Sequence, residues 1–171
     1  MARYLIDPGR SRVWIDARSS LHAIRSTSDG LEGFVELALA ADGSVDLDRS
    51  PAGRISLPVS RLSTGNRMED RELAKRIDAT RYPTLEGVLE QMAPSEGDHA
   101  YRVAGQITFR GVTRAHEGSM TVVAEPHGLL RLTGSSRFDV RTFGLEPPRV
   151  LMMKVDPEVD VRVEIVADQA G

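Results

Sequence analysis

Apolar and polar residues alternate with a period of two in many windows of the chain, which is the pattern of β-strands with one buried face. The last window is the clearest, because Val159, Val161 and Val163 alternate with charged residues. Windows of this kind cover residues 11–17, 32–40, 54–62, 84–92, 101–109, 115–124, 129–140 and 158–165. Turn dipeptides such as Asp42-Gly43 and Arg110-Gly111 lie between them. The pattern predicts about eight strands.

One segment follows a helical pattern instead. Asn66 with Glu69 three residues later resembles a capping box, and Pro83 ends the helical region. The apolar stripe of the segment is thin, with Leu73 and Ile77 at positions i and i+4. We therefore expect one short helix at about residues 66–77 that lies on the surface of the domain or covers a barrel end.

Regularly spaced strands of this number favour a sandwich or a closed barrel, and closure removes the two unpaired edges of an open sheet. The 171 residues fit one domain, and they contain no internal repeat, linker or low-complexity segment. We expect an all-β fold over residues 1–171, a single eight-stranded antiparallel barrel with one surface helix.

Composition narrows the class of function. The net charge is −3 with acids and bases mixed along the chain, so we expect no nucleic-acid partner. There is no cysteine, which excludes disulfides, thiolate metal sites and thiol catalysis. No apolar run approaches a membrane span, and residues 1–8 lack the apolar core of an export signal. These features predict a soluble, cytoplasmic protein and leave a homodimer open.

No catalytic or metal-binding motif stands out. The chain has 4 histidines, His22, His99, His116 and His127, and no two have a metal-ligand spacing on one expected element. His116-Glu117 begins like a zinc-protease motif, but the second histidine is missing and the context is a strand. A nucleophile elbow and a phosphate-binding loop are also missing. We expect no metal, no cofactor and no catalytic residue, although groups that meet only in three dimensions would escape this search.

Alternation also indicates which residues face the barrel interior. The expected inward residues are Ile15, Val35, Leu37, Leu57, Val59, Leu89, Ile107, Phe109, Met120, Val122, Leu130, Leu132, Phe138 and Met152. Such an interior either packs solid or holds one slender ligand. A hydrocarbon suits it, since each methylene removed from water contributes about 0.8 kcal/mol. Trp14, Arg141 and Phe143 are candidates for the barrel mouth, where charge could receive a polar head group, although solvated loop charge is the simpler interpretation of Arg141.

Several short motifs resemble one family. They are Tyr4-Leu5-Ile6-Asp7 followed by Ser11-Arg12-Val13, then Leu62-Ser63-Thr64-Gly65, Tyr82-Pro83-Thr84, the stretch GQITFRGVT at residues 105–113, and Arg141-Thr142-Phe143-Gly144. In this order they are similar to the signatures of the YceI-like family. The resemblance implies a lipocalin-like, eight-stranded antiparallel barrel whose interior tunnel holds a polyisoprenoid chain or an isoprenoid quinone, with no known catalytic machinery.

The chain departs from the family pattern in places. Leu85-Glu86-Gly87 follows Tyr82-Pro83-Thr84, where relatives usually place an aromatic and then a small polar residue, so the ligand can differ. We expect non-enzymatic binding, storage or transport of a long apolar ligand. The alternatives are a small enzyme acting on a lipid-like or aromatic substrate in the same cavity, and an interaction module with a filled interior.

Overall fold

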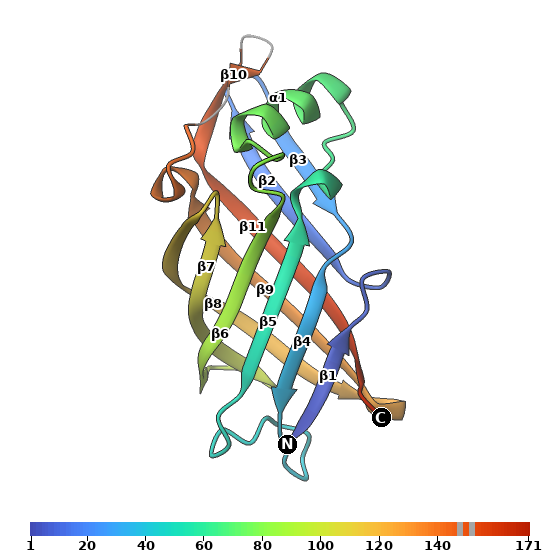
Figure 1. Ribbon diagram of the computed structural model, residues 1–171. Helices are drawn as coiled ribbons and strands as arrows, with labels where there is room; N and C mark the ends of the chain where they lie inside the picture. The colour runs from blue at the N-terminus through green and yellow to red at the C-terminus, as the bar shows by residue number, and fades with distance from the viewer. Residues whose placement is uncertain (147–148, 151–152) are drawn as a thin grey trace.

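The computed structural model describes residues 1–146, 149–150 and 153–171, and most of its backbone is β-strand (Figure 1). The strands are β1 (Ala2–Ile6), β2 (Arg12–Ser19), β3 (Ala23–Ser28), β4 (Glu32–Leu37), β5 (Ala52–Pro58), β6 (Thr84–Pro94), β7 (Ala100–Phe109), β8 (Val112–Glu125), β9 (Leu129–Asp139), β10 (Arg149–Val150) and β11 (Met153–Gln169). The helical segments are α1 (Arg67–Ile77) and the 3-10 turns η1 (Val59–Arg61), η2 (Pro126–Gly128) and η3 (Val140–Phe143).

Within the described residues, eight strands form a closed antiparallel ring. The order of the ring is β1, β4, β5, β6, β7, β8, β9 and β11. β11 then pairs with β1 through Tyr4↔Gln169 and Ile6↔Ala167, which closes the circle. Closure gives each of these strands a neighbour on both edges. The eight-stranded antiparallel barrel expected from the sequence is confirmed.

Two positions in the barrel wall are each shared by two short strands, β1 with β2 and β4 with β3. β2 pairs with β11 further along the edge that β1 uses, and β3 pairs with β2 as β4 pairs with β1. The outer edge of β3 meets the segment before α1 through the bridge Thr27↔Ser63. The segment before α1 therefore borders β3 at this end of the barrel, whereas β4 pairs with both β1 and β5 at the other.

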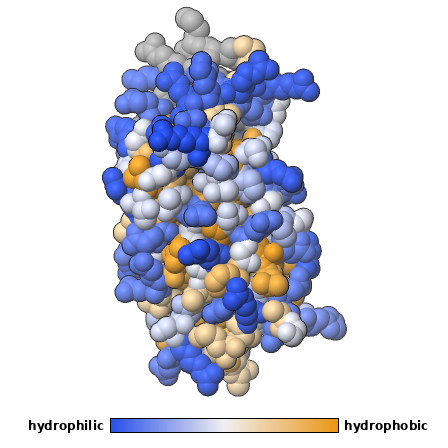
Figure 2. Space-filling view, in the orientation of Figure 1, coloured by the Kyte–Doolittle hydropathy of each residue, from blue (hydrophilic) through white to orange (hydrophobic). Residues whose placement is uncertain are grey.

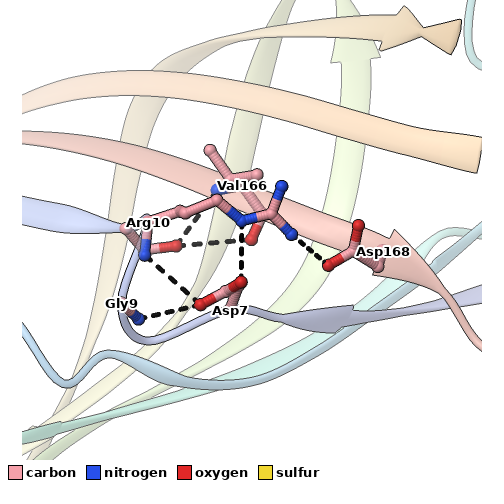
Figure 3. Close-up of polar contacts among 6 residues, drawn as sticks. Asp7, Gly9, Arg10, Val166 and Asp168 are labelled. Atoms are coloured by element: carbon pink, nitrogen blue, oxygen red, sulfur yellow. Dashed lines mark hydrogen bonds and ion pairs between the residues drawn. The ribbon is translucent and has the colours of Figure 1, made fainter.

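Asp7 and Arg10 stabilise the break between β1 and β2 (Figure 3). The Asp7 carboxylate accepts hydrogen bonds from the Gly9 amide at 2.9 Å and from Arg10 Nε at 2.7 Å. The Arg10 guanidinium also contacts the carboxylate of Asp168 on β11. These hydrogen bonds hold the pKa of Asp7 below its ordinary value, and the bond from the Arg10 side chain has the largest effect. The contacts lie at the point along β11 where its pairing partner changes from β1 to β2.

Helix α1 lies at one end of the barrel, and both chain termini lie at the opposite end (Figure 1). The side chain of Asn66 caps the helix by accepting hydrogen bonds from the amides of Met68 at 2.9 Å and Glu69 at 3.2 Å. Leu73 and Ile77 face the barrel, so the expected helix over a barrel end is confirmed. The predicted capping box is only half formed. The Asn66 side chain caps the helix, but the Glu69 side chain makes no bond back to the cap and lines the barrel interior instead.

The outer surface is mostly polar. Figure 2 shows one face on which hydrophilic side chains predominate, with smaller apolar areas between them. Exposed large apolar side chains of the described residues come from separate elements, for example Leu21 in the β2–β3 turn, Met68 in α1 and Val123 in β8. Isolated apolar side chains on a surface are normal. Most large apolar side chains lie in the interior, where the candidate site lies.

Candidate functional site

A packed cluster fills the barrel at the end where the termini lie. Leu37, Val122, Leu130 and Ala167 each have 0% exposed surface and belong to one buried cluster. Leu37 pairs with Ala2, next to the N-terminus, which places the cluster at this end. We call the four fully buried residues the floor. Close packing here leaves no room for a ligand at this end of the barrel.

A second buried cluster covers the opposite end beneath α1. We call it the roof, and it consists of Val59, Ile77, Phe109, Phe143 and Leu145. Phe109 and Phe143 meet edge to face, with ring centroids 5.9 Å apart. The roof brings together residues from β7, η1, η3 and α1, so segments far apart in the sequence close this end jointly.

A cavity of about 400 Å³ lies inside the barrel, with roof residues among its lining. This volume falls within the range of roughly 300–1,000 Å³ that is typical of small-molecule sites. Its lining is almost wholly apolar. The expected inward residues that line it are Ile15, Val35, Leu57, Val59, Leu89, Ile107, Phe109, Met120, Leu132 and Phe138. The barrel is thus hollow over part of its length and packed over the rest.

The remaining expected inward residues do not line this cavity. Leu37, Val122 and Leu130 face inward but belong to the floor, because alternation gives the side of a strand and not the depth along the barrel axis. Met152 lies outside the described residues.

The candidates for the barrel mouth are in three different places. Trp14 is on the outer face of β2, with the Arg162 guanidinium 4.4 Å from its ring centroid. Arg141 is exposed and pairs with Asp139 at 2.7 Å. Phe143 is buried in the roof and lines the cavity. The structure therefore brings only the last of the three to the cavity.

Glycines create much of the open space. Gly53, Gly87, Gly105, Gly118 and Gly134 all line the cavity from within strands. Gly134 on β9, for example, pairs with Met120 on β8 and with Val163 on β11. Alternation along β9 would place an inward side chain between those two, and glycine leaves that space open. Glycine weakens a strand and often marks a place that something approaches closely. The apolar pattern alone did not predict these lining residues. A glycine at an inward position of an expected strand is the sequence signal that could have identified them.

Polar residues contribute little of the cavity surface, although several lie along it. His116 on β8 lines it, forms a hydrogen bond through Nε2 with the Ser136 hydroxyl, and stacks on the ring of Phe138. Burial lowers the pKa of His116 below its ordinary value, against the opposing effect of the Glu117 charge. The neutral imidazole is therefore favoured at neutral pH, which suits an apolar surrounding.

Glu69 of α1 also lines the cavity at the roof end, and the residue is 8% exposed.

Across residues 1–146, 149–150 and 153–171, no group of three or more His, Cys, Asp or Glu side chains is placed to hold a metal ion. In the same described stretches, no helix has the length and apolar character to cross a membrane.

The fold and its interior define a class, a lipocalin-like antiparallel barrel with an apolar internal cavity. The model of the YceI-like domain matches residues 4–167. The chain belongs to the YceI-like family, as the sequence motifs indicated. A search by sequence among curated proteins found no match.

Solved structures share the fold over most of its length. BcnA of Burkholderia cenocepacia superposes with a TM-score of 0.77 at 18% identity, over 94% of this chain and 98% of that one. A polyisoprenoid binding domain from Saccharophagus degradans gives 0.78 at 13% identity, over 99% and 100%. The YCEI protein of Campylobacter jejuni gives 0.67 at 9% identity, over 86% of each chain. At these identities the likeness shows the fold alone.

Proposed function

We propose that this chain binds a long apolar molecule, a polyisoprenoid or an isoprenoid quinone, inside the barrel and stores or transports it without changing it chemically. The observation that carries the proposal is the cavity of about 400 Å³ with its almost wholly apolar lining. The polyisoprenoid binding domain with the same fold supports the choice of ligand class.

The energetics of the cavity favour a chain-like ligand. Each methylene that moves from water into such a lining contributes about 0.8 kcal/mol and requires no polar partner. An apolar lining discriminates poorly between chains that differ by a methylene. The length of the cavity and the polar groups at its ends therefore set the identity of the ligand.

Native mass spectrometry of the protein purified from its own host, followed by organic extraction, tests the proposal. We expect a non-covalent adduct whose mass is that of a hydrophobic molecule. Gly118→Leu should abolish the adduct, because its side chain would occupy the cavity. A Cβ at Gly118 would meet its nearest neighbours at 3.6 Å, an ordinary van der Waals distance, so the backbone can accept the change.

Ala115→Leu is the matched control. Ala115 is exposed on the same strand, three positions earlier and on the opposite face, so the same side chain is added outside the barrel. The proposal fails if the wild type carries no hydrophobic molecule and takes up no added prenyl quinone, or if both variants bind as the wild type does. Recovery of a chemically altered ligand would favour the enzyme alternative.

A further inference from the structure

Helix α1 places Glu69, a residue with little exposed surface, over the cavity. Glu69 is 8% exposed, and it precedes Leu73 and Ile77 by one and two turns on the face of the helix that lines the cavity. Among the described residues, no side chain or backbone group forms a hydrogen bond or ion pair with its carboxylate; its backbone amide donates to Asn66 Oδ1 at 3.2 Å. An acid on a residue with so little exposed surface ordinarily has a partner, because removal of charge from water is costly.

The helix does not need this carboxylate for its own structure. In a capping box Glu69 would accept from the Asn66 amide, but that amide donates to Thr64 Oγ1 at 3.2 Å. Asp70 is the acid that fastens the entry to the helix, since it accepts from the Thr64 amide at 2.8 Å and the Thr64 hydroxyl at 2.7 Å. The usual structural reason for an acid at the position of Glu69 is therefore met by other groups.

We propose that Glu69 recognises the polar end of the ligand, and that this end carries a hydroxyl group, as in a polyprenol or the reduced form of a prenyl quinone. This inference rests on the proposed function. An ionised carboxylate only accepts hydrogen bonds, and a hydroxyl donor gives it a charge-assisted bond. A phosphate or diphosphate would place a second negative charge beside it, and the oxygens of an oxidised quinone have no proton to donate.

A second polar group at the same end fits a hydroxyl ligand. Ser26 is 7% exposed and lines the cavity, and its neighbour Thr27 bridges to Ser63 just before α1. The Ser26 hydroxyl donates to the Ile15 carbonyl over a long 3.4 Å, so its oxygen keeps acceptor capacity and its bond is easily exchanged. A hydroxyl both donates and accepts, which matches an acid and a serine lining one cavity.

The test compares probes that share one isoprenoid chain: geranylgeraniol, its diphosphate, and the hydrocarbon without the hydroxyl. Each is titrated into the ligand-stripped full-length protein by native mass spectrometry. We expect the wild type to bind the alcohol about tenfold more tightly than the hydrocarbon, and the diphosphate least. Glu69→Leu should remove the preference for the alcohol while keeping the hydrocarbon, and Glu69→Gln should weaken the discrimination against the diphosphate.

Glu72→Gln is the control, because Glu72 lies on the same helix and pairs with Arg76 at 3.2 Å instead of lining the cavity. It should leave all affinities unchanged. A prenyl quinol measured beside its quinone separates the two sources of the hydroxyl. Equal binding of alcohol and hydrocarbon by the wild type, or a preference that survives in Glu69→Leu, overturns the inference and leaves the proposed function standing. Failure of every probe to bind overturns the proposed function itself.

Discussion

The ring of His116 on β8 stacks on the ring of Phe138 on β9, with centroids 3.9 Å apart and planes 15° from parallel. The backbone pairing of these two strands ends at Ser119↔Ser135, before it reaches the rings. Side chains therefore join the wall beyond that point, including the hydrogen bond between His116 and Ser136. This contact between β8 and β9 includes a stacked imidazole, which burial keeps in its neutral form.

Mild acid should weaken the fold through His116. Burial lowers its pKa in the folded state, so the unfolded chain takes up the proton at a higher pH than the folded chain does. Its contribution to stability is full above the unfolded pKa of about 6.5 and is lost as the pH falls through the folded value. We expect the melting temperature of the wild type, followed by circular dichroism, to fall between about pH 7 and pH 5 more than that of His116→Gln.

His22→Gln is the matched control for that experiment, since His22 is exposed in the turn between β2 and β3. It should keep the pH dependence of the wild type. An unchanged slope in His116→Gln would show that His116 does not couple protonation to folding.

Arginine substitutions should separate the floor from the cavity. Leu37 is fully buried in the floor, so an unpaired arginine there should destabilise the protein by several kcal/mol and prevent folding. Ile107 lines the cavity, so Ile107→Arg has space for the side chain and should fold with a smaller loss of stability. We expect Ile107→Arg to lose binding of an added prenyl quinone while its circular dichroism spectrum stays that of the wild type. Equal unfolding of both variants would contradict a hollow interior at Ile107.

The sequence predicted most strands that have one buried and one exposed face. It missed β1, where Leu5 is apolar although it faces outward, so the period of two is broken. It also missed β3, where two of the inward side chains are Ser26 and Ser28, so no apolar period is present. It also extended one strand window beyond Pro58, where the chain turns into η1. Proline lacks the amide hydrogen that a central strand needs, which explains the early end.

The cavity could be predicted only in part, since alternation identifies the inward face alone. Leu37 and Ile107 have the same pattern, yet one is in the floor and the other lines the cavity. The open space arises where side chains are missing, as at Gly118, and a search for apolar residues does not detect it. Glu69 was hidden for a different reason, because its spacing from Asn66 suggested a capping role that Thr64 performs.

Removal of the Asp7 charge should change the response to strong acid. The Arg10 side chain is the main cause of the lowered pKa of Asp7, so the stabilising contact is present above the unfolded value of about 3.8 and is lost as the pH falls through the folded value. We expect Asp7→Asn to melt at a lower temperature at neutral pH and to lose less on acidification below about pH 4. Asp98→Asn, in an exposed loop, should match the wild type in thermal melts. The same acid response in Asp7→Asn and the wild type would contradict a contribution from this contact.

Glu69→Leu should make the ligand-free protein more stable. Glu69 is 8% exposed and its carboxylate has no partner among the described residues, whereas leucine at this position would extend the apolar stripe of Leu73 and Ile77 over the cavity. We expect the free energy of unfolding from urea titration to rise by about 1 kcal/mol, because leucine buries more apolar surface. Glu72→Leu should not stabilise, because it removes the ion pair with Arg76 and adds an apolar side chain outside the cavity. A loss of stability in Glu69→Leu would mean that the carboxylate supports the fold, whereas a gain together with lost preference for the alcohol is the behaviour of a residue retained for binding.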